Sequence, residues 1–475
     1  MARETAILVA LGSYLALVLA LGWIAHRRTS DSAGFYLGGR TLGPWVAALA
    51  ANASSSSAWS LVGVSGFAYA EGFAAIWVLP GVLAGFLINW LIVAPRLRDR
   101  TGAAVTVTEF LAGPPGRRGR AAVVLFATAL TLGSLLTYVA SQMQAAEGAF
   151  RLGLGTSATT GIVIGALITV LYTLVGGYLA VSLTDTVQGL LMVLVAIVLP
   201  AAAIVHFGGV GELATAIDAV EVDGYEAPFG TRAGLAAAGF ALAQLGIGLG
   251  YPGQPHALNK FMGMAPGASM RVARTVGIGW AVILYTGMLV VGWAARAAGV
   301  ALEPGQKDDA LFLASRTLLP PLVDGVVVAA VLAAIMSTVD SQLLVCASSV
   351  THDLPLVRGA ARTDRPPRGL LLIARLTVLA IGAGALAAAL TVEKDVFSNV
   401  LFAWAALGSA FGPLLLVRLL VGEVAPPWAL ASMVVGGGWA IAAFYLEPVL
   451  AKGFADRVLS WIAALAVAWF GARRR

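Results

Sequence analysis

One apolar segment, near residues 322–350, carries several side chains that could bind a cation. Ser337, Thr338 and Ser341 supply hydroxyl oxygens, and Asp340 supplies a carboxylate, on neighbouring turns of the expected helix. Sodium is a hard cation that prefers several oxygen ligands, as calcium does. Hydroxyls can instead bond back to their own helix. A carboxylate deep in a membrane helix is harder to explain that way, because it costs about 3 kcal/mol or more unless it is paired or hydrated.

A second carboxylate, Asp185, comes just before an apolar segment that the sequence predicts over 187–207. Aspartate is a good N-cap for a helix. A carboxylate at this depth can also ligate a cation. The sequence leaves both roles open for Asp185.

Two other apolar segments contain sequence that disrupts a helix in mid-span. Residues 54–57 are four adjacent serines, which compete for backbone hydrogen bonds. Residues 246–255 combine four glycines with two prolines, which remove helical preference and hydrogen-bond donors. Serine and glycine can simply allow close helix packing. Interruptions at matching places in two halves are instead typical of an inverted-repeat transporter, whose unwound backbone binds an ion near mid-membrane.

The composition indicates that lipid is the solvent for most of the chain. Of 475 residues, 59% are hydrophobic and 11% are charged, whereas a soluble domain has about 25% charged residues. Uninterrupted apolar stretches of about 20 residues are read as helices, which satisfy their own backbone in lipid. The loops are too short for an independent core. Residues 1–475 are therefore predicted to form a single all-α polytopic membrane domain.

About thirteen membrane-spanning segments are predicted, and their loops carry an asymmetric charge. Basic residues follow the first, third, seventh and ninth segments and end the chain, which places those parts in the cytoplasm. The loop after the sixth segment is acidic and falls on the other side. We therefore expect a multi-pass protein of the cytoplasmic membrane, with the N-terminus outside and the C-terminus inside. The segments lie near 5–26, 43–70, 72–95, 120–150, 158–176, 187–207, 234–252, 270–298, 322–350, 369–390, 396–420, 427–446 and 456–471.

The basic residues sit between apolar segments, so the net charge of +6 indicates membrane topology and no nucleic-acid partner. They are Arg27, Arg28, Arg40, Arg96, Arg98, Arg100, Arg117, Arg118, Arg120, Lys260, Arg271, Arg274, Arg358, Arg362, Arg365, Arg368 and Arg473 to Arg475.

Six motifs in chain order resemble the sodium/solute symporter family, with the bacterial sodium/proline symporters as the nearest pattern. The resemblance covers nearly the whole chain and implies a LeuT-like fold of two inverted five-helix repeats. The repeats are expected at 43–207 and 234–420, with peripheral helices in 1–42 and 427–475. The motifs are FYLGGR at 35–40, GGYLAVSLTDTVQ at 176–188, GLGY at 248–251, GQPH at 253–256, AIMST at 334–338 and QLLVC at 342–346.

The resemblance also implies ligands for ions and solute at matching positions. The first sodium site, between the second and ninth segments, is implied to comprise Ala53, Ser56, Ala334, Ser337 and Thr338. A second site, found in some relatives, maps to Asp185, Ser337, Asp340 and Ser341. The implied solute pocket contains Ser55, Ser57, Tyr138, Ile247, Tyr251 and Pro255.

Two of these pocket positions depart from the pattern of the proline carriers. Ser55 stands where those carriers have an aspartate, and Ile247 stands where they have a tryptophan that faces the substrate. The first change removes a charge near the sodium site and the second reshapes the pocket. Proline is therefore the leading solute within a wide field of amino acids and organic acids.

These features predict a secondary active transporter, with no cofactor beyond sodium as the coupling ion. Sodium-coupled uptake of a small organic solute, proline or another amino acid, is the leading hypothesis. Proton coupling is the nearest rival, because Asp340 stands where the proline carriers have a hydroxyl and could take up a proton. A sodium-coupled organic-acid symporter is a further alternative. The solute, the ion stoichiometry and the oligomeric state stay open.

Two other classes of protein receive less support. A transporter-like membrane sensor needs a cytoplasmic output domain, for which little sequence follows the segment at 456–471. An enzyme is not expected, because the four histidines are scattered without metal-ligand spacing or a nucleophile–base pair. The histidines are His26, His206, His256 and His352.

Overall fold

A computed structural model describes residues 2–26, 38–102, 104–175, 177–303, 305–354, 368–446 and 453–472. Some of the residues named above lie outside these ranges. They are Arg27, Arg28, Phe35, Tyr36, Leu37, Gly176, Arg358, Arg362, Arg365 and Arg473 to Arg475.

The described residues form a bundle of α-helices. The helices are α1 (Arg3–His26), α3 (Pro44–Ala58), α4 (Val64–Glu71), α5 (Val78–Leu87), α6 (Ala94–Arg100), α7 (Val107–Ala112), α8 (Arg120–Leu154), α9 (Ala158–Val175), α10 (Tyr178–Phe207), α11 (Val210–Asp218), α12 (Gly234–Gly246), α13 (Pro255–Met262), α14 (Met270–Ala297), α15 (Ala310–Leu318), α16 (Pro321–Ser348), α18 (Arg368–Thr391), α19 (Val396–Leu420), α20 (Pro426–Leu446) and α21 (Ser460–Phe470). Short 3-10 or π turns link several of them: η1 (Gly38–Arg40), η2 (Trp59–Gly63), η3 (Gly72–Trp77), η4 (Ile88–Val93), η5 (Ile247–Gly253), η6 (Lys307–Asp309), η7 (Ser349–Asp353) and η8 (Ala455–Leu459).

Ten helical stretches in the described ranges are long and apolar enough to cross a membrane. One of them, Pro44–Arg100, contains the two segments expected at 43–70 and 72–95. The segment expected at 158–176 is the shorter apolar helix α9, and the last expected segment is formed by η8 and α21. The estimate of about thirteen segments is therefore approximate, whereas the all-helical polytopic fold is confirmed.

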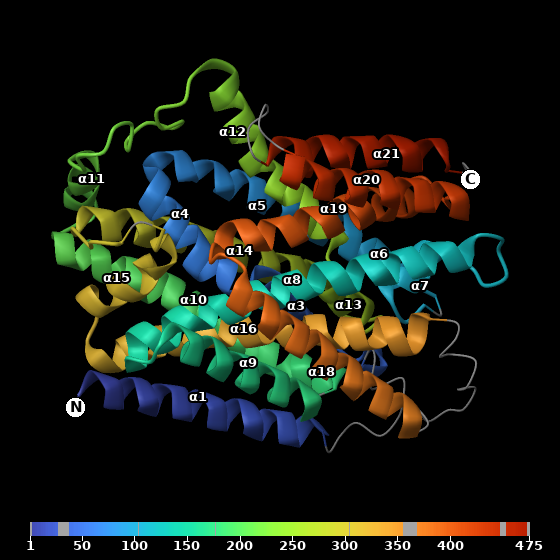
Figure 1. Cartoon of the computed structure of the whole chain (residues 1–475), viewed down its shortest axis with the longest axis horizontal. Coiled ribbons are helices and arrows are strands. Elements are labelled where there is room, and N and C mark those ends of the chain that lie inside the picture. The colour runs from blue at the N-terminus through green and yellow to red at the C-terminus, as the bar shows by residue number, and fades with distance from the viewer. Residues whose placement is uncertain are drawn as a thin grey trace.

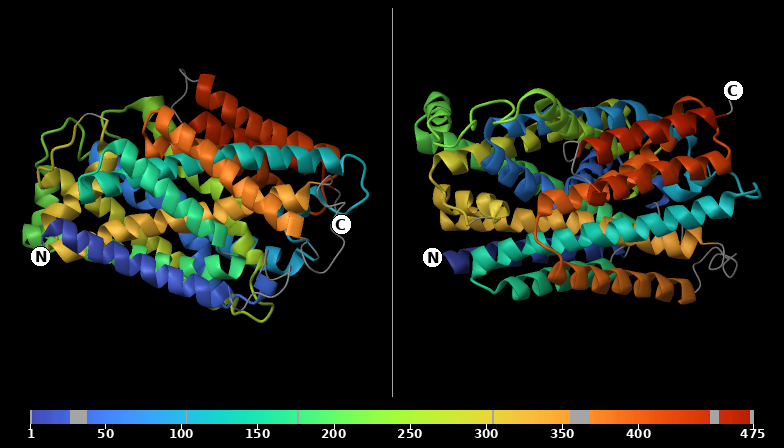
Figure 2. Two further views of the ribbon diagram at one scale, coloured as in Figure 1. Left: turned by 60° about the horizontal axis from the view of Figure 1, so that its bottom comes forward. Right: turned by 45° about the horizontal axis from the view of Figure 1, so that its top comes forward.

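The long helices run alongside one another, and the two chain ends lie at opposite ends of the bundle (Figure 1). Helix α11 lies at the end that holds the N-terminus, whereas α6 and α7 lie toward the end that holds the C-terminus (Figure 1). The other two views show the same arrangement (Figure 2). The acidic loop and the basic loop after the third predicted segment thus sit at opposite ends, as the charge asymmetry predicts.

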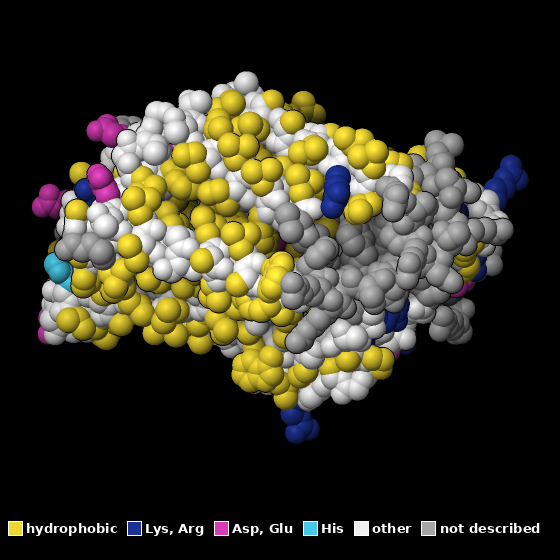
Figure 3. Space-filling view, turned by 90° about the horizontal axis from the view of Figure 1, so that it is seen from below, with side chains coloured by type: hydrophobic (Ala, Val, Ile, Leu, Met, Phe, Trp, Pro, Cys, Tyr) yellow, Lys and Arg dark blue, Asp and Glu magenta, His cyan; other side chains and the backbone are white. Residues whose placement is uncertain are grey.

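The outer surface of the bundle suits lipid. Large apolar side chains such as Leu17, Leu171 and Leu376 point outward with about half of their surface exposed. Figure 3 shows apolar side chains spread over the middle of one face, with acidic side chains gathered at its left end. The interior is supplied chiefly by α16 and α19, which are buried along nearly their whole length. Because lipid is itself apolar, the buried polar residues of α16 carry more functional information than its apolar ones.

Both predicted interruptions are present in the structure. Within α3, Ser57 adopts φ 49° and ψ −175°, a non-helical conformation that is uncommon for a residue with a side chain. In the second half of the chain, α12 passes into the 3-10 turn η5, and Gln254 is extended before Pro255 starts α13. The helix-breaking interpretation of both stretches is confirmed.

Close packing contributes to the second interruption as well. A Cβ atom on Gly250 would lie 2.0 Å from Trp404 Nε1, and one on Gly253 would lie 2.5 Å from the Cα atom of Gly408. These two glycines therefore let α19 approach the turn directly, in addition to weakening the helix.

One predicted boundary is wrong. Helix α10 begins at Tyr178 and not near 187, so Asp185 lies inside a helix and its interpretation as an N-cap is wrong. The hydroxyls of Ser182, Thr184 and Thr186 each donate to the carbonyl four residues earlier. Because these side chains satisfy their own polar atoms, a run that reads as a loop continues the helix.

The turn η6, between α14 and α15, packs against the start of α19. Asp308 Oδ2 accepts a hydrogen bond from the Val396 backbone N–H at 3.0 Å, and Lys307 Nζ lies 3.0 Å from Asp395 Oδ2. Burial raises the pKa of Asp308 to about 6, against the lowering effect of the Val396 hydrogen bond and of nearby Lys394. Burial also disfavours the charged form of Asp395, but the attraction of Lys307 and hydrogen bonds from Ser398 outweigh it and lower the pKa of Asp395.

Replacing Asp308 with asparagine should stabilise the protein at neutral pH. Above pH 6 the folded state holds a buried carboxylate that the unfolded chain ionises more easily, and a pKa difference of about two units corresponds to about 3 kcal/mol. Asparagine keeps the acceptor for Val396 without the charge. We expect a higher melting temperature for Asp308→Asn at pH 7.5, with a difference that shrinks as the pH falls from 6 toward 4.

Asp395→Asn is the matched control for this experiment. It should lower the melting temperature at pH 7.5, because the charged form of Asp395 is the stabilised one. Equal melting temperatures of Asp308→Asn and the unchanged protein across this pH range would contradict the assignment of Asp308.

Candidate functional site

The interruption in α3 lies directly against the hydroxyl-bearing turn of α16. Ser337 Oγ donates to the Ala53 carbonyl at 3.3 Å, and Thr338 Oγ1 lies 3.4 Å from the same oxygen. Ser337 Oγ also lies 3.1 Å from the carbonyl of Ala334. Four of the five predicted ligands of the first sodium ion therefore share one hydrogen-bonded cluster. Each is buried, so a cation held there would exchange water for protein oxygens.

The fifth predicted ligand, Ser56, lies at the same interruption. Its hydroxyl accepts a hydrogen bond from the Tyr285 hydroxyl at 3.2 Å, which links the cluster to α14. The structure thus brings all five residues to the junction of α3 with α16 and α14. Their role as sodium ligands stays a prediction.

Side chains accept hydrogen bonds from the backbone where Ser57 interrupts the helix. The Ala58 N–H donates to Gln142 Oε1 at 3.0 Å, and the Trp59 N–H donates to Ser57 Oγ at 3.1 Å. The Trp59 N–H also bonds the Ser56 carbonyl, so side chain and backbone together satisfy the donors at the interruption. A positive φ at a residue with a side chain costs about 1–2 kcal/mol, and such strain is typical of functional sites.

A second polar cluster surrounds Asp185. Lys260 Nζ lies 2.9 Å from Asp185 Oδ2, and both side chains are almost completely buried. Ser54 Oγ donates to the same carboxylate oxygen at 3.0 Å, and Ser341 Oγ lies 3.4 Å from it. Asp340 Oδ1 accepts the backbone N–H of Ser341. Three of the four predicted members of the second sodium site, Asp185, Asp340 and Ser341, thus lie in this region together with an ammonium group, whereas Ser337 contacts Ala53 and Ala334 instead.

The sequence places Lys260 among the loop residues that set topology, and that prediction is wrong. It lies in α13, the half-helix that follows η5, and its ammonium group is buried. The available signal was its place one helical turn beyond the interrupted stretch, where a charged residue faces the bundle interior. Periodicity alone does not show that α13 turns back into the protein.

Aromatic side chains form the walls around the two interruptions. The Tyr138 hydroxyl donates to Ser57 Oγ at 3.2 Å. The hydroxyls of Tyr251 and Tyr285 lie 3.0 Å apart, and the Tyr251 ring packs against Trp404 with centroids 4.7 Å apart. Three predicted pocket residues, Ser57, Tyr138 and Tyr251, are therefore close to the interruptions. Tyr285 and Trp404 are not among the predicted pocket residues, because aromatic residues in apolar helices cannot be told from ordinary packing residues by sequence.

The other predicted pocket residues are less directly placed. Ser55 Oγ donates to the Asn52 carbonyl in its own helix at 3.1 Å. Ile247 is buried in η5, and its carbonyl accepts a hydrogen bond from Trp404 Nε1 at 3.0 Å. Pro255 is the first residue of α13. These three residues shape the interruptions chiefly through the backbone, and their contact with solute stays a prediction.

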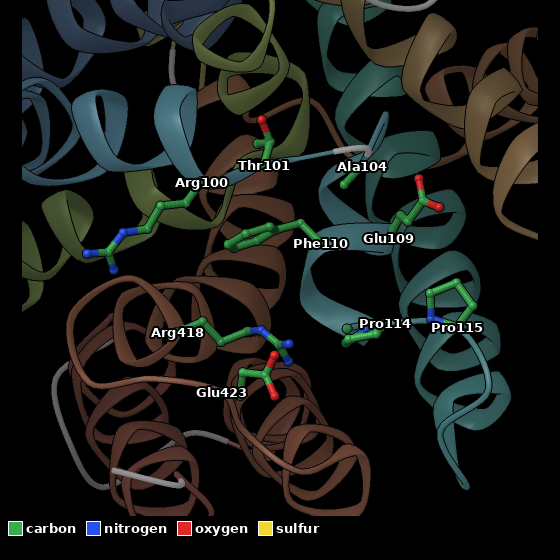
Figure 4. A pocket seen from close by; sticks show the side chains of 10 residues that line it. Arg100, Thr101, Ala104, Glu109, Phe110, Pro114, Pro115, Arg418 and Glu423 are labelled. Carbon is green, nitrogen blue, oxygen red and sulfur yellow. The ribbon is translucent and has the colours of Figure 1, made fainter. Parts of the chain in front are cut away.

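A cavity of about 540 Å³ lies away from all of these residues, between α7 and the end of α19. In Figure 4, the Arg418 and Glu423 side chains lie side by side, with the Phe110 ring between them and Arg100. None of the predicted site residues lines this cavity. Next to the polar cluster around Asp185, a much smaller cavity of about 20 Å³ is lined by Lys260, His256 and Ser341 among others. The packed centre, and not the roomier cavity, therefore holds the predicted site.

Residues 35–436 match the model of the sodium:solute symporter family. The chain belongs to this family. It is 36% identical over 439 residues to the osmoregulated proline transporter OpuE of Bacillus subtilis, covering 90% of this chain and 87% of that protein. It is 34% identical over 447 residues to the sodium/proline symporter of Escherichia coli, covering 92% and 87%. These relatives are transporters, and the predicted family is confirmed.

Solved structures identify the fold of this family member. A sodium-coupled sialic acid symporter in a substrate-bound outward-open state superposes with a TM-score of 0.80 at 18% identity, covering 99% of both chains. The transporter Mhp1 in an inward-facing conformation gives a TM-score of 0.53 at 19% identity, covering 91% of this chain and 90% of its own. The LeuT-like fold is confirmed, whereas the repeat boundaries at 43–207 and 234–420 stay predictions.

Removing the Thr338 hydroxyl should weaken the response of transport to sodium. Thr338→Val keeps the shape of the side chain but takes away an oxygen that faces the Ala53 carbonyl, and a sodium ion needs several oxygen ligands. We expect the sodium concentration for half-maximal uptake to rise at least about tenfold, as for the loss of about 1.4 kcal/mol of ion binding.

Thr377→Val in α18 is the control, because the Thr377 hydroxyl bonds the Ile373 carbonyl of its own helix. It should leave the sodium dependence of uptake unchanged. An unaltered sodium response in Thr338→Val vesicles would remove Thr338 from the ion site.

Proposed function

We propose that this symporter carries proline or a closely related amino acid into the cell together with sodium. The observation that carries the proposal is the contact between the interrupted α3 and the hydroxyls of Ser337 and Thr338. The named functions of the relatives from Bacillus subtilis and Escherichia coli support proline as the solute.

The proposed first sodium site consists of neutral oxygens from two separate elements. Ala53 and Ser56 belong to α3, whereas Ala334, Ser337 and Thr338 belong to α16. A cation at this junction would tie the two helices together, because each supplies only part of the ligand set. Sodium binding would thereby favour one conformer, and a solute that prefers the same conformer binds more tightly by linkage.

The proposed solute site provides donors for a carboxylate. Gln142 Nε2 and Trp59 Nε1 are buried and have no acceptor among the described residues. Both side chains lie at the interruption, where the second half of the helix begins after Ser57. The positive end of a half-helix favours an anionic group. The Tyr285 ring, whose centroid lies 6.0 Å from that of Trp59, offers an apolar surface for the rest of a small amino acid.

The proposed topology places the N-terminus outside and the C-terminus in the cytoplasm of a bacterial inner membrane. It rests on the acidic and basic loops at opposite ends of the bundle and on the excess of basic residues in cytoplasmic loops. The mechanism that fits this arrangement is alternating access, in which sodium moving inward down its gradient drives the solute. A membrane potential of 100 mV adds about 2.3 kcal/mol for each charge that moves inward.

Proton coupling is a second candidate because of one observation. Asp340 Oδ2 is buried and has no hydrogen-bond partner among the described residues. A proton on that oxygen would remove a buried charge from a membrane helix.

Uptake into vesicles should separate the two coupling ions. Radiolabelled proline should accumulate when an inward sodium gradient is imposed at equal pH on both sides, and it should not when a pH gradient is imposed without sodium. A panel of other amino acids and organic acids, each at excess, should reveal competitors. Accumulation driven equally well by the pH gradient alone would assign the coupling to protons.

Gln142→Glu should impair solute binding more than sodium binding. The glutamate keeps an acceptor for the Ala58 N–H but replaces the amide donor with a charge that repels a carboxylate. We expect the KM for proline to rise about tenfold or more, which corresponds to about 1.4 kcal/mol. Thr137→Val on the same helix is the control, because that hydroxyl bonds the Gly133 carbonyl in its own helix. An unchanged KM would exclude Gln142 from the solute site.

A further inference from the structure

The ammonium group of Lys260 occupies a position that a metal cation could otherwise take. It lies 2.9 Å from Asp185 Oδ2, 3.3 Å from Ser182 Oγ and 5.0 Å from the centre of the Tyr178 ring. A carboxylate, a hydroxyl and an aromatic face are the groups with which a buried cation interacts favourably. The relative exposure of the two side chains is 2% for Lys260 and 0% for Asp185, so water does not screen this pair.

The hydroxyls around Asp185 are oriented toward the carboxylate. Ser54 Oγ donates to Asp185 Oδ2 at 3.0 Å, and Ser341 Oγ lies within 3.4 Å of the same atom. The two hydroxyls lie 3.1 Å from each other. Asp185 Oδ2 is therefore already surrounded by an ammonium and two hydroxyl groups. A sodium ion at this oxygen would have to displace the ammonium group.

The charges in this region allow for one additional cation. With both carboxylates ionised, Asp185 and Asp340 carry two negative charges, and Lys260 returns one positive charge. The ligands of the proposed first sodium site are carbonyls and hydroxyls, which add no charge. Two oxygens, Asp185 Oδ1 and Asp340 Oδ2, have no hydrogen-bond donor among the described residues, consistent with one remaining negative charge.

We propose that Lys260 is a tethered cation, which fills the place of a second sodium ion on Asp185 and limits the chain to one sodium ion per solute. This inference rests on the proposed sodium coupling. It assigns Lys260 as a residue that determines ion stoichiometry. It also replaces the second predicted sodium site with an internal ion pair between Lys260 and Asp185.

The position of Lys260 also links the ion pair to the interruption in the second half of the chain. Lys260 belongs to α13, which begins at Pro255 immediately after η5 and Gln254. Asp185 belongs to α10, and Ser341 to α16. A movement of α13 relative to α10 would therefore change the distance between the ammonium and the carboxylate. The pair holds α13 against α10, and the Tyr178 hydroxyl adds a bond to the Asn259 carbonyl at 2.8 Å.

The number of sodium ions bound to the purified full chain tests the proposal. Binding of radioactive sodium is measured without solute on the unchanged protein, Lys260→Met, Lys260→Arg and the double variant Asp185→Asn with Lys260→Met. We expect one sodium ion per chain and a Hill coefficient near one for the unchanged protein and for Lys260→Arg. Lys260→Met should bind two ions with a Hill coefficient approaching two, because Asp185 then lacks a cation. The double variant should return to one ion.

Two results overturn the proposal: two sodium ions on the unchanged protein, or one ion of unchanged affinity on a folded Lys260→Met. Should Lys260→Met fail to fold, the unchanged protein and the neutral double variant decide, since each must bind one ion. An unchanged protein that binds no sodium refutes the proposed function instead, so the two failures are distinguishable. Uptake into vesicles provides a further test. The number of charges that Lys260→Met moves across the membrane with each solute molecule should be twice that of the unchanged protein.

Discussion

Every buried backbone N–H and carbonyl group needs a hydrogen-bond partner, and this need governs the centre of the protein. In lipid an unpaired N–H or carbonyl costs several kcal/mol, so an interrupted helix persists only where neighbouring side chains supply the missing partners. At the interruption in α3, Gln142 and Ser57 accept the N–H groups of Ala58 and Trp59, while Ser337 and Thr338 meet the Ala53 carbonyl one turn earlier. Oxygens of α3 and α16 therefore converge close to the point where the helix breaks. The proposed cation site and the strained backbone thus lie in the same place.

Buried charge sets the second constraint. Lys260 and Asp185 neutralise each other in a place that water does not reach, and removal of either partner would leave the other uncompensated. Pairing across α13 and α10 also connects the segment after the second interruption to the first half of the chain. The ion pair thus connects α13 to α10, and in our proposal it also limits how many sodium ions the region accepts.

The family relationship identifies the class of transporter, whereas the geometry of the site shows which residues meet. The match over residues 35–436 establishes the class of transporter, and the superposition on the sialic acid symporter establishes the fold. Neither observation assigns a ligand in this chain. The contacts of Ser337, Asp185 and Lys260 show which polar groups meet, and the roles of these residues in ion binding stay proposals.

The sequence by itself determined the helical membrane fold, the two interruptions and the family. These depend on composition, on uninterrupted apolar length and on residues such as the four serines at 54–57, all of which act locally along the chain. It also identified Ser337 and Thr338, because hydroxyls beside a carboxylate are conspicuous in an apolar helix. Local patterns placed the start of α10 wrongly, because polar residues that bond to their own helix look like a loop.

Only the tertiary structure decided which of these residues meet. Ser337 lies 284 residues beyond Ala53, and Lys260 lies 75 residues beyond Asp185. Contacts across such separations depend on how the helices pack, which no local pattern specifies. The position of Lys260 shows the physical reason most clearly. A lysine near a predicted helix end is equally compatible with a cytoplasmic loop and with a buried ion pair, and only the direction that α13 takes after Pro255 distinguishes the two.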